Sequence, residues 1–146
     1  MESPVIKESK FLLHTEEGRR LLSFALFQPT EEKITARSDQ YAEDKACRIF
    51  FALVHDVPVG LCILKETENI QEILILSVSP PFRRQGIGRA MMHFLRVRFP
   101  DSPLIAETDD DAVDFYRRCG FNILSLGEIY PGVTRYTCTL QKEEYS

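Results

Sequence analysis

The fold of this chain is decided by one stretch, Ser77-Val78-Ser79-Pro80-Pro81-Phe82-Arg83-Arg84-Gln85-Gly86-Ile87-Gly88-Arg89. It joins an apolar run of strand length, residues 70–78, to a helical pattern over residues 86–99. Gly86 and Gly88 remove side chains where a ligand would approach the backbone. The first N–H groups of the following helix have no partner within the helix, and the arginines add positive charge. The stretch therefore predicts a site for a phosphate or a pyrophosphate.

Two common phosphate-binding loops do not fit these residues. A P-loop needs Gly-x-x-x-x-Gly-Lys-Ser/Thr, which the stretch does not contain. The dinucleotide fingerprint needs a third glycine where Met91 stands, and it belongs early in a parallel α/β unit. Taken by themselves, the glycines and arginines fit a tight, solvent-exposed turn as well as they fit a ligand site.

Three strands lead into the stretch. The apolar runs 47–54, 59–64 and 70–78 predict them, and the short turns between them predict antiparallel pairing. The third run is apolar on both faces after Glu72, so we expect it in the centre of the sheet, covered on both sides.

Two helices and an edge strand are expected nearer the N-terminus. A hydroxyl cap followed by acidic residues predicts a helix that begins at Thr15 and ends at Pro29, and a second helix that begins at Thr30. Val5 and Ile6 predict a short edge strand.

After the stretch, the pattern alternates between helix and strand. Residues 104–106 predict a buried strand that follows a crossover helix and can run parallel to the third strand. Residues 109–119 predict a helix with Gly120 as its left-handed C-cap. Two last strands are expected over residues 121–126 and 134–140. The order predicts one α/β domain, residues 1–146, with a mixed sheet and helices on both faces.

Composition excludes several classes of protein. The chain has 146 residues, 44% hydrophobic and 27% charged, as in a soluble globular domain, with neither a membrane-spanning run nor a signal-peptide pattern. Its net charge of −4 argues against nucleic-acid or membrane partners. The four cysteines form no Cys-x-x-Cys, so we expect no metal site and a reducing, cytoplasmic location.

A family resemblance covers nearly the whole chain. Arg83-x-x-Gly86-x-Gly88 after a hydrophobic strand resembles the acyl-CoA signature of the GNAT superfamily of N-acetyltransferases. The segment Ala112-Val113-Asp114-Phe115-Tyr116-Arg117-Arg118-Cys119-Gly120-Phe121 resembles the family's second signature, and the order of elements is similar. The resemblance implies a mostly antiparallel sheet whose fourth and fifth strands are parallel and splayed. It also implies acetyl-CoA as co-substrate.

The resemblance further implies how the coenzyme is held. The pantetheine arm would lie in the splay against Val78, and the loop from Arg83 to Arg89 would hold the pyrophosphate, mainly through main-chain N–H groups. The expected coenzyme-binding residues are Leu76, Ser77, Val78, Arg83, Arg84, Gln85, Gly86, Ile87, Gly88, Arg89, Asp109, Phe115 and Tyr116.

Three residues carry the implied chemistry. The Leu76 N–H would stabilise the oxyanion, and Tyr116 would protonate the leaving thiolate. Glu72 matches in placement the general-base glutamate of one branch of the family, and burial would make it a better base. Glu107, Asp109 and a water chain remain alternatives for the base. Many family members carry Asn at the start of the helix predicted over residues 109–119, where the present chain has Asp109-Asp110-Asp111. These acids match the positive end of a helix, and Asp109 could also face the acceptor and attract an ammonium group.

The resemblance implies an acetyltransferase. The neutral primary amine of a small molecule or peptide would attack acetyl-CoA directly in a ternary complex. The alternative on the same fold is a non-catalytic acyl-CoA-binding or sensing module. An enzyme acting on protein or tRNA is a third hypothesis, and the acidic pI of about 5.4 disfavours tRNA. A homodimer is compatible with the family.

Overall fold

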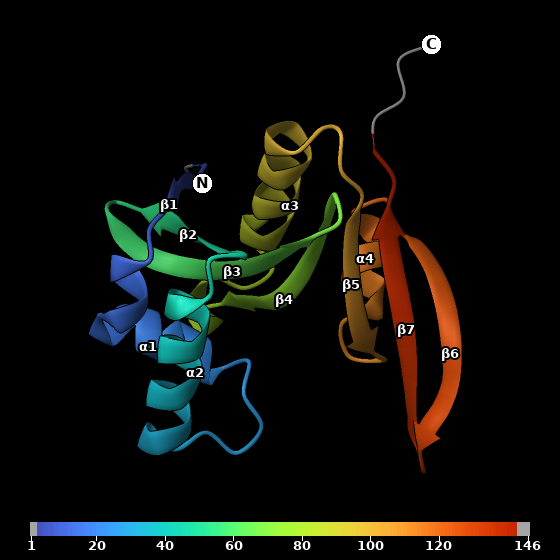
Figure 1. The fold of residues 1–146 in the computed structure, drawn as a ribbon, viewed down its shortest axis with the longest axis horizontal. Helices are drawn as coiled ribbons and strands as arrows, with labels where there is room; N and C mark the ends of the chain where they lie inside the picture. The colour runs from blue at the N-terminus through green and yellow to red at the C-terminus, as the bar shows by residue number, and fades with distance from the viewer. Residues whose placement is uncertain (1–2, 143–146) are drawn as a thin grey trace.

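The structure, a computed structural model, describes residues 3–142, and in these residues seven strands form one sheet in the order β1-β2-β3-β4-β5-β7-β6 (Figure 1). In chain order the strands are β1 (Val5–Glu8), β2 (Cys47–Val54), β3 (Val57–Thr67), β4 (Ile70–Val78), β5 (Leu104–Asp109), β6 (Asn122–Tyr130) and β7 (Val133–Leu140). Strand β4 lies in the centre, and it pairs antiparallel with β3 and parallel with β5. The predicted fold class is confirmed.

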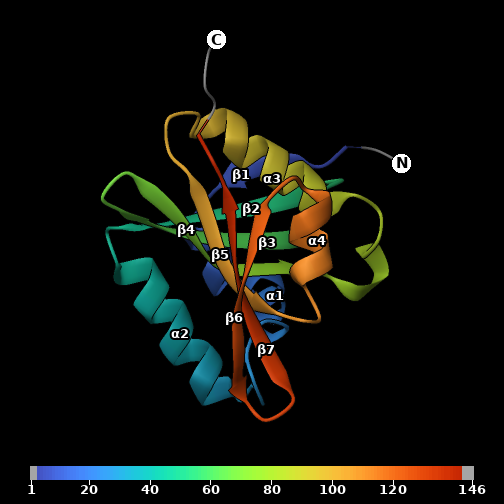
Figure 2. The same cartoon turned by 90° about the vertical axis from the view of Figure 1, so that its right-hand side faces the viewer.

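Helices cover both faces of the sheet (Figures 1 and 2). The helices are α1 (Glu16–Ser23), α2 (Glu31–Glu43), α3 (Ile87–Arg98) and α4 (Val113–Arg118), with 3-10 turns over Phe11–His14 and Pro80–Phe82. α1 and α2 pack on one face through Leu21, Leu22 and Ile34, and α3 and α4 pack on the other. No helix within residues 3–142 has the length and apolar character needed to cross a bilayer.

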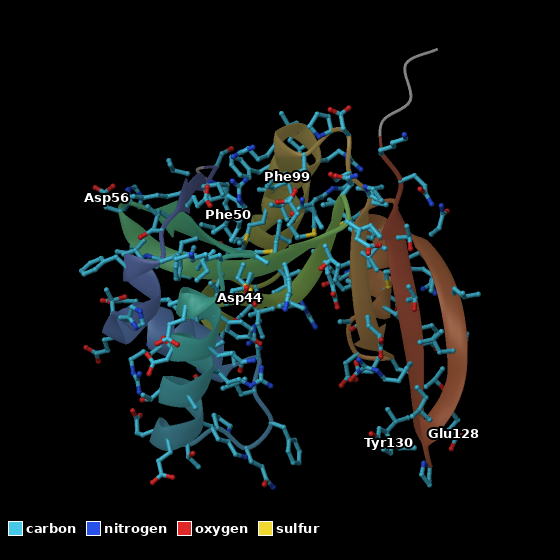
Figure 3. All side chains as sticks on the ribbon, in the orientation of Figure 1. Asp44, Phe50, Asp56, Phe99, Glu128 and Tyr130 are labelled. Atoms are coloured by element: carbon cyan, nitrogen blue, oxygen red, sulfur yellow. The ribbon has the colours of Figure 1, made fainter. Side chains whose placement is uncertain are left out.

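Two cores therefore lie on opposite sides of the sheet. In the core under α3, the Phe50 ring of β2 meets the Phe94 and Phe99 rings edge-on, with centroids 5.7 and 6.3 Å apart (Figure 3). Side chains alternate between the two faces of a strand, so β2 supplies both cores, with Phe51 facing α1 and α2. The strands predicted as dense apolar runs are those buried on both faces.

Local chemistry explains where the first two helices begin. The Thr15 hydroxyl accepts the Gly18 N–H at 3.2 Å, and the Thr30 hydroxyl accepts the Lys33 N–H at 3.2 Å. Both helices begin where the sequence predicted. The first helix, however, ends at Ser23 rather than at Pro29. Its buried stripe stops at Leu22, so another helical turn would bury little apolar surface.

The predicted helix over residues 109–119 is also shorter. Residues 107–109 pair with residues 135–137 of β7, so their backbone groups belong to β5, and α4 begins only at Val113. The predicted cap is confirmed, because Gly120 follows α4 with a φ of +91°.

Candidate active site

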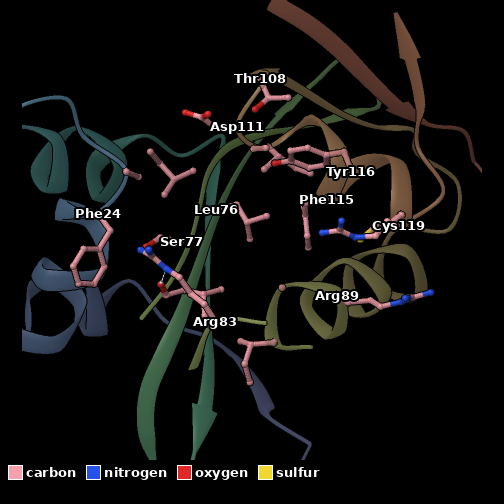
Figure 4. Close-up of a pocket in the computed structure, with 18 of the residues that line it drawn as sticks. Phe24, Leu76, Ser77, Arg83, Arg89, Thr108, Asp111, Phe115, Tyr116 and Cys119 are labelled. Atoms are coloured by element: carbon pink, nitrogen blue, oxygen red, sulfur yellow. Dashed lines mark hydrogen bonds between the residues drawn. The ribbon is translucent and has the colours of Figure 1, made fainter. Parts of the chain in front are cut away.

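Strands β4 and β5 separate halfway along their length. They pair only through residues 71–73 and 104–106 within the described part of the chain, so the splay expected from the resemblance is present. A cleft of about 1130 Å³ opens where they diverge (Figure 4). Its lining residues are Phe24, Ala25, Ile73, Leu74, Ile75, Leu76, Ser77, Val78, Phe82, Arg83, Arg84, Gly86, Ile87, Gly88, Arg89, Glu107, Thr108, Asp109, Asp111, Ala112, Phe115, Tyr116, Arg118 and Cys119.

A β-bulge interrupts β4 beside this cleft. Ile63 of β3 pairs with Ile75, whereas the next residue, Leu64, pairs with Ile73, so Leu74 is the extra residue. An extra residue reverses the alternation of backbone directions along the strand. The bulge therefore decides which N–H groups of β4 face the cleft.

Two hydrogen bonds fix those directions. Before the bulge, the Gln71 N–H donates toward β5, to the Pro103 carbonyl at 3.0 Å. After it, the Ser79 N–H donates toward β3 at 2.8 Å. Because directions alternate within a strand, the N–H groups of Leu76 and Val78 point away from β3 and into the cleft. An unbulged strand would point the N–H groups of residues 75 and 77 there instead.

Ser77 lines the cleft but turns its hydroxyl away from it. The hydroxyl donates to the Leu21 carbonyl of α1 at 2.7 Å in buried surroundings. Leu21 lies in the last turn of α1, where carbonyls have no partner within the helix, so Ser77 satisfies one of them. Ser77 therefore ties β4 to the end of α1.

The two glycines of the loop serve different needs. Gly86 is the N-cap of α3 with a φ of +85°, and a Cβ there would meet nothing within 4 Å. It is required for its backbone conformation and leaves open space at the start of the helix. At Gly88 a Cβ would lie 2.9 Å from the Phe115 ring, so this glycine lets α3 pack closely on α4.

The structure brings most, but not all, of the predicted loop side chains to the cleft. Arg84 and Arg89 line it. The Arg83 Nε donates to the Val78 carbonyl at 2.9 Å. Gln85 is not among the lining residues, and its side chain donates to the Pro81 carbonyl at 3.0 Å instead. The loop thus presents main-chain groups and arginines, with Gln85 folded back on the loop itself.

Tyr116 enters the cleft from α4 (Figure 4). Its ring lies edge-on between Phe115 and Phe121, with both centroids 5.2 Å away, and the residue is 6% exposed. Burial raises the pKa of Tyr116 above its ordinary value of 10.0, because the phenolate would lose its hydration. The phenol therefore keeps its proton at neutral pH and can act as a donor.

Glu72 lies outside the cleft, and it lacks the burial that would make it a better base. It is exposed near the start of β4, opposite Lys65 of β3, and it is not among the lining residues. It precedes the bulge, so its side chain points to the opposite face from its buried neighbours, Gln71 and Ile73. The apolar run that follows Glu72 does not cover it.

Carboxylates line the cleft from the β5 side. Glu107, Asp109 and Asp111 are lining residues, and Glu107 pairs with the Arg135 Nε at 3.4 Å. Asp109 is half-buried and accepts the Asp111 N–H at 3.0 Å. Figure 4 shows the Asp111 carboxylate pointing away from Tyr116.

Sequence reasoning missed the wall that α1 contributes. Phe24 and Ala25 follow the end of α1 and line the cleft opposite α4. They carry no motif, since an aromatic residue after an amphipathic helix usually belongs to the core.

Comparisons with known proteins agree with this geometry. A family model described as an acetyltransferase (GNAT) domain matches residues 45–123. A protein of Bacillus methanolicus named an uncharacterised N-acetyltransferase in the lysA 3′ region is 31% identical over 100 residues, which are 68% of this chain and 82% of that protein.

Solved structures share the fold across almost the whole chain. The ribosomal-protein-S18-alanine N-acetyltransferase of Escherichia coli superposes with a TM-score of 0.72 at 17% identity, covering 98% of this chain and 96% of that one. An acetyltransferase of Elizabethkingia anophelis, solved with acetyl-CoA bound, superposes with a TM-score of 0.71 at 19% identity, covering 97% and 99%.

Proposed function

The chain belongs to the GNAT family of acetyltransferases, and from this premise we propose that it transfers the acetyl group of acetyl-CoA to a primary amine of a small molecule or peptide. The observation that carries the proposal is the open edge of β4. There the N–H groups of Leu76 and Val78 face a cleft that leads to the first turn of α3.

The donors that line this cleft support acetyl-CoA as the co-substrate. The edge of β4 offers main-chain groups to the amides of the pantetheine arm, as a neighbouring strand would. The open space at Gly86 and the first N–H groups of α3 suit a diphosphate, with Arg84 and Arg89 adding charge. The acetyl-CoA bound to the Elizabethkingia anophelis enzyme supports the same co-substrate here.

Two groups of the chain act on the reacting thioester. The Leu76 N–H is held in a rigid strand and donates to the carbonyl oxygen as the amine nitrogen attacks, which stabilises the oxyanion by about 3 kcal/mol. The phenol of Tyr116 then donates its proton to the sulfur as the C–S bond breaks. The amine nitrogen keeps the acetyl group, and its extra proton passes to a base.

The base is one of the groups that line the cleft. Asp109 is half-buried and Glu107 is engaged by Arg135, so Asp109 or a water that it holds is better placed than Glu107. The exposed position of Glu72 outside the cleft argues against the first candidate from the sequence.

Release of free CoA thiol tests the proposal. The full chain is incubated with acetyl-CoA and a panel of amines: spermidine, tyramine, a lysine-containing peptide and a peptide with an N-terminal alanine. We expect at least one amine to raise thiol release at least about tenfold above hydrolysis. Binding of acetyl-CoA in calorimetry without turnover of any amine would instead indicate an acyl-CoA-binding module.

A further inference from the structure

Phe24 stands on the acceptor side of the cleft. The proposed diphosphate site, Gly86 and the first turn of α3, lies on the sheet face that α3 and α4 cover. An amine must then reach the thioester from the other face, which α1 and α2 cover. Phe24 follows α1, lines the cleft and is 38% exposed. The Phe24 ring therefore lines the path by which an acceptor amine would reach the thioester.

The ring is held by arginines from two different parts of the chain. The guanidinium of Arg20, one helical turn earlier, lies 5.8 Å from the Phe24 centroid. The guanidinium of Arg83, from the loop after β4, lies 5.6 Å from the same centroid (Figure 4). The Arg83 Nε is fixed by the Val78 carbonyl at 2.9 Å. The position of the ring therefore depends on the end of β4 as well as on α1.

A second tie fixes the same segment. The Ser77 hydroxyl holds the Leu21 carbonyl at 2.7 Å, three residues before Phe24. Ser77 of β4 thus contacts the last turn of α1, and Arg83 of the following loop contacts Phe24 just after it. After Phe24 the Phe27 side chain is 83% exposed, and the Lys33 ammonium donates to the Phe27 and Gln28 carbonyls at 3.3 and 3.1 Å.

We propose that Arg83 is a positioning residue for the acceptor, which it affects by holding Phe24, rather than a side-chain ligand of the coenzyme. The inference rests on the proposed function only for the identity of the acceptor side. Main-chain groups of the loop remain available to the diphosphate, whereas the Arg83 side chain is directed to Val78 and Phe24. Arg83 thereby couples the coenzyme loop to the acceptor wall.

The test distinguishes a contact of the Arg83 side chain with Phe24 from a contact of that side chain with the coenzyme. Arg83→Gln and Phe24→Leu are made singly and together in the full chain, with Arg20→Gln as the matched control. The control removes a guanidinium from the same ring but leaves the link between the two segments intact. Amide hydrogen exchange of residues 21–30 is measured without ligand, and acetyl-CoA affinity is measured by calorimetry.

We expect Arg83→Gln and Phe24→Leu each to speed exchange in residues 21–30 about fivefold to tenfold. The exchange rate of the double variant should exceed that of either single variant by no more than about twofold, because both substitutions remove the same contact between Arg83 and Phe24. Arg20→Gln should change exchange by less than about twofold. The acetyl-CoA dissociation constant of Arg83→Gln should stay within about threefold, while the KM of the best amine rises about fivefold at unchanged kcat.

Unchanged exchange in Arg83→Gln overturns the proposal whatever the activity shows. So does a tenfold weaker acetyl-CoA affinity with unchanged amine KM, which would make Arg83 a coenzyme ligand. If the wild-type chain binds no acetyl-CoA, the proposed function fails, and the exchange measurement still decides whether Arg83 holds Phe24.

Discussion

Tyr116 shows how one side chain combines packing with chemistry. Its ring packs between the rings of Phe115 and Phe121, and the residue also lines the cleft. Tyr116→Phe keeps the ring and removes the proton donor, so we expect kcat to fall about 10² to 10⁴-fold with acetyl-CoA affinity nearly unchanged. Steady-state kinetics and calorimetry check this. A kcat within about threefold of wild type would remove Tyr116 from the proton transfer.

The same burial predicts how stability responds to alkaline pH. The pKa of Tyr116 is raised in the folded state above its ordinary value of 10.0. The unfolded chain therefore loses this proton first, and stability is full below about pH 10 and falls as pH rises toward the folded pKa. Urea unfolding at pH 8 and pH 10.5 should show a smaller loss in Tyr116→Phe than in wild type. An equal loss would contradict the shift.

The structure reverses the order in which the sequence ranked two candidate bases, Glu72 and Asp109. Asp109 lines the cleft and is half-buried, whereas Glu72 is exposed outside it. We expect Asp109→Asn to lower kcat/KM at least about tenfold at pH 7, and Glu72→Gln to lower it less than about threefold. Matched pH–rate profiles of the two variants measure this, and the reverse order would restore Glu72 as the base.

The loop before α3 offers a controlled test at the scale of an element. Gly86 and Gly127 share a φ of +85°, and a Cβ at either would meet nothing within 4 Å, but Gly127 lies in β6 away from the cleft. Glutamate should cost similar stability at both positions, about 1 kcal/mol. Gly86→Glu also places a negative charge at the start of α3.

We therefore expect Gly86→Glu to weaken acetyl-CoA binding more than about 100-fold, and Gly127→Glu to leave it within about threefold. Calorimetry on both folded variants checks the difference. Equal affinities would place the diphosphate elsewhere.

The elements themselves were mostly predictable from sequence. Thr15 and Thr30 begin their helices because capping is a contact between residues three apart. The ends were less predictable: α1 stops at Ser23 and β5 extends to Asp109 for reasons that lie in distant partners. At Asp109 the expected helix is replaced by strand pairing with Arg135 of β7.

In the whole molecule, the sheet consists of two parts, β1 to β4 and β5 to β7, which are joined only by a short parallel pairing of β4 with β5 in the described residues. β4 and β5 pair over residues 71–73 and 104–106 and then diverge (Figure 1). The cleft lies between the two diverging strands. A ligand that bridges the cleft should stabilise the folded chain by about 2.7 kcal/mol at 100 times its dissociation constant, or roughly 5 to 10 °C in melting temperature.

Thermal unfolding with and without acetyl-CoA measures this stabilisation. Gly86→Glu should lose the shift, and Gly127→Glu should keep it. A shift retained by Gly86→Glu would contradict binding at the loop.

Sequence patterns are sufficient to predict the order of elements, the antiparallel strands before the loop and the glycine-containing turn that opens α3. These depend on side-chain periodicity and on contacts between residues close in the chain. Tertiary structure alone decided which backbone N–H groups face the cleft, because the bulge at Leu74 arises in the pairing of β4 with β3. It also decided that Glu72 is exposed and that Phe24 meets Arg83, since both follow from segments distant in sequence packing together.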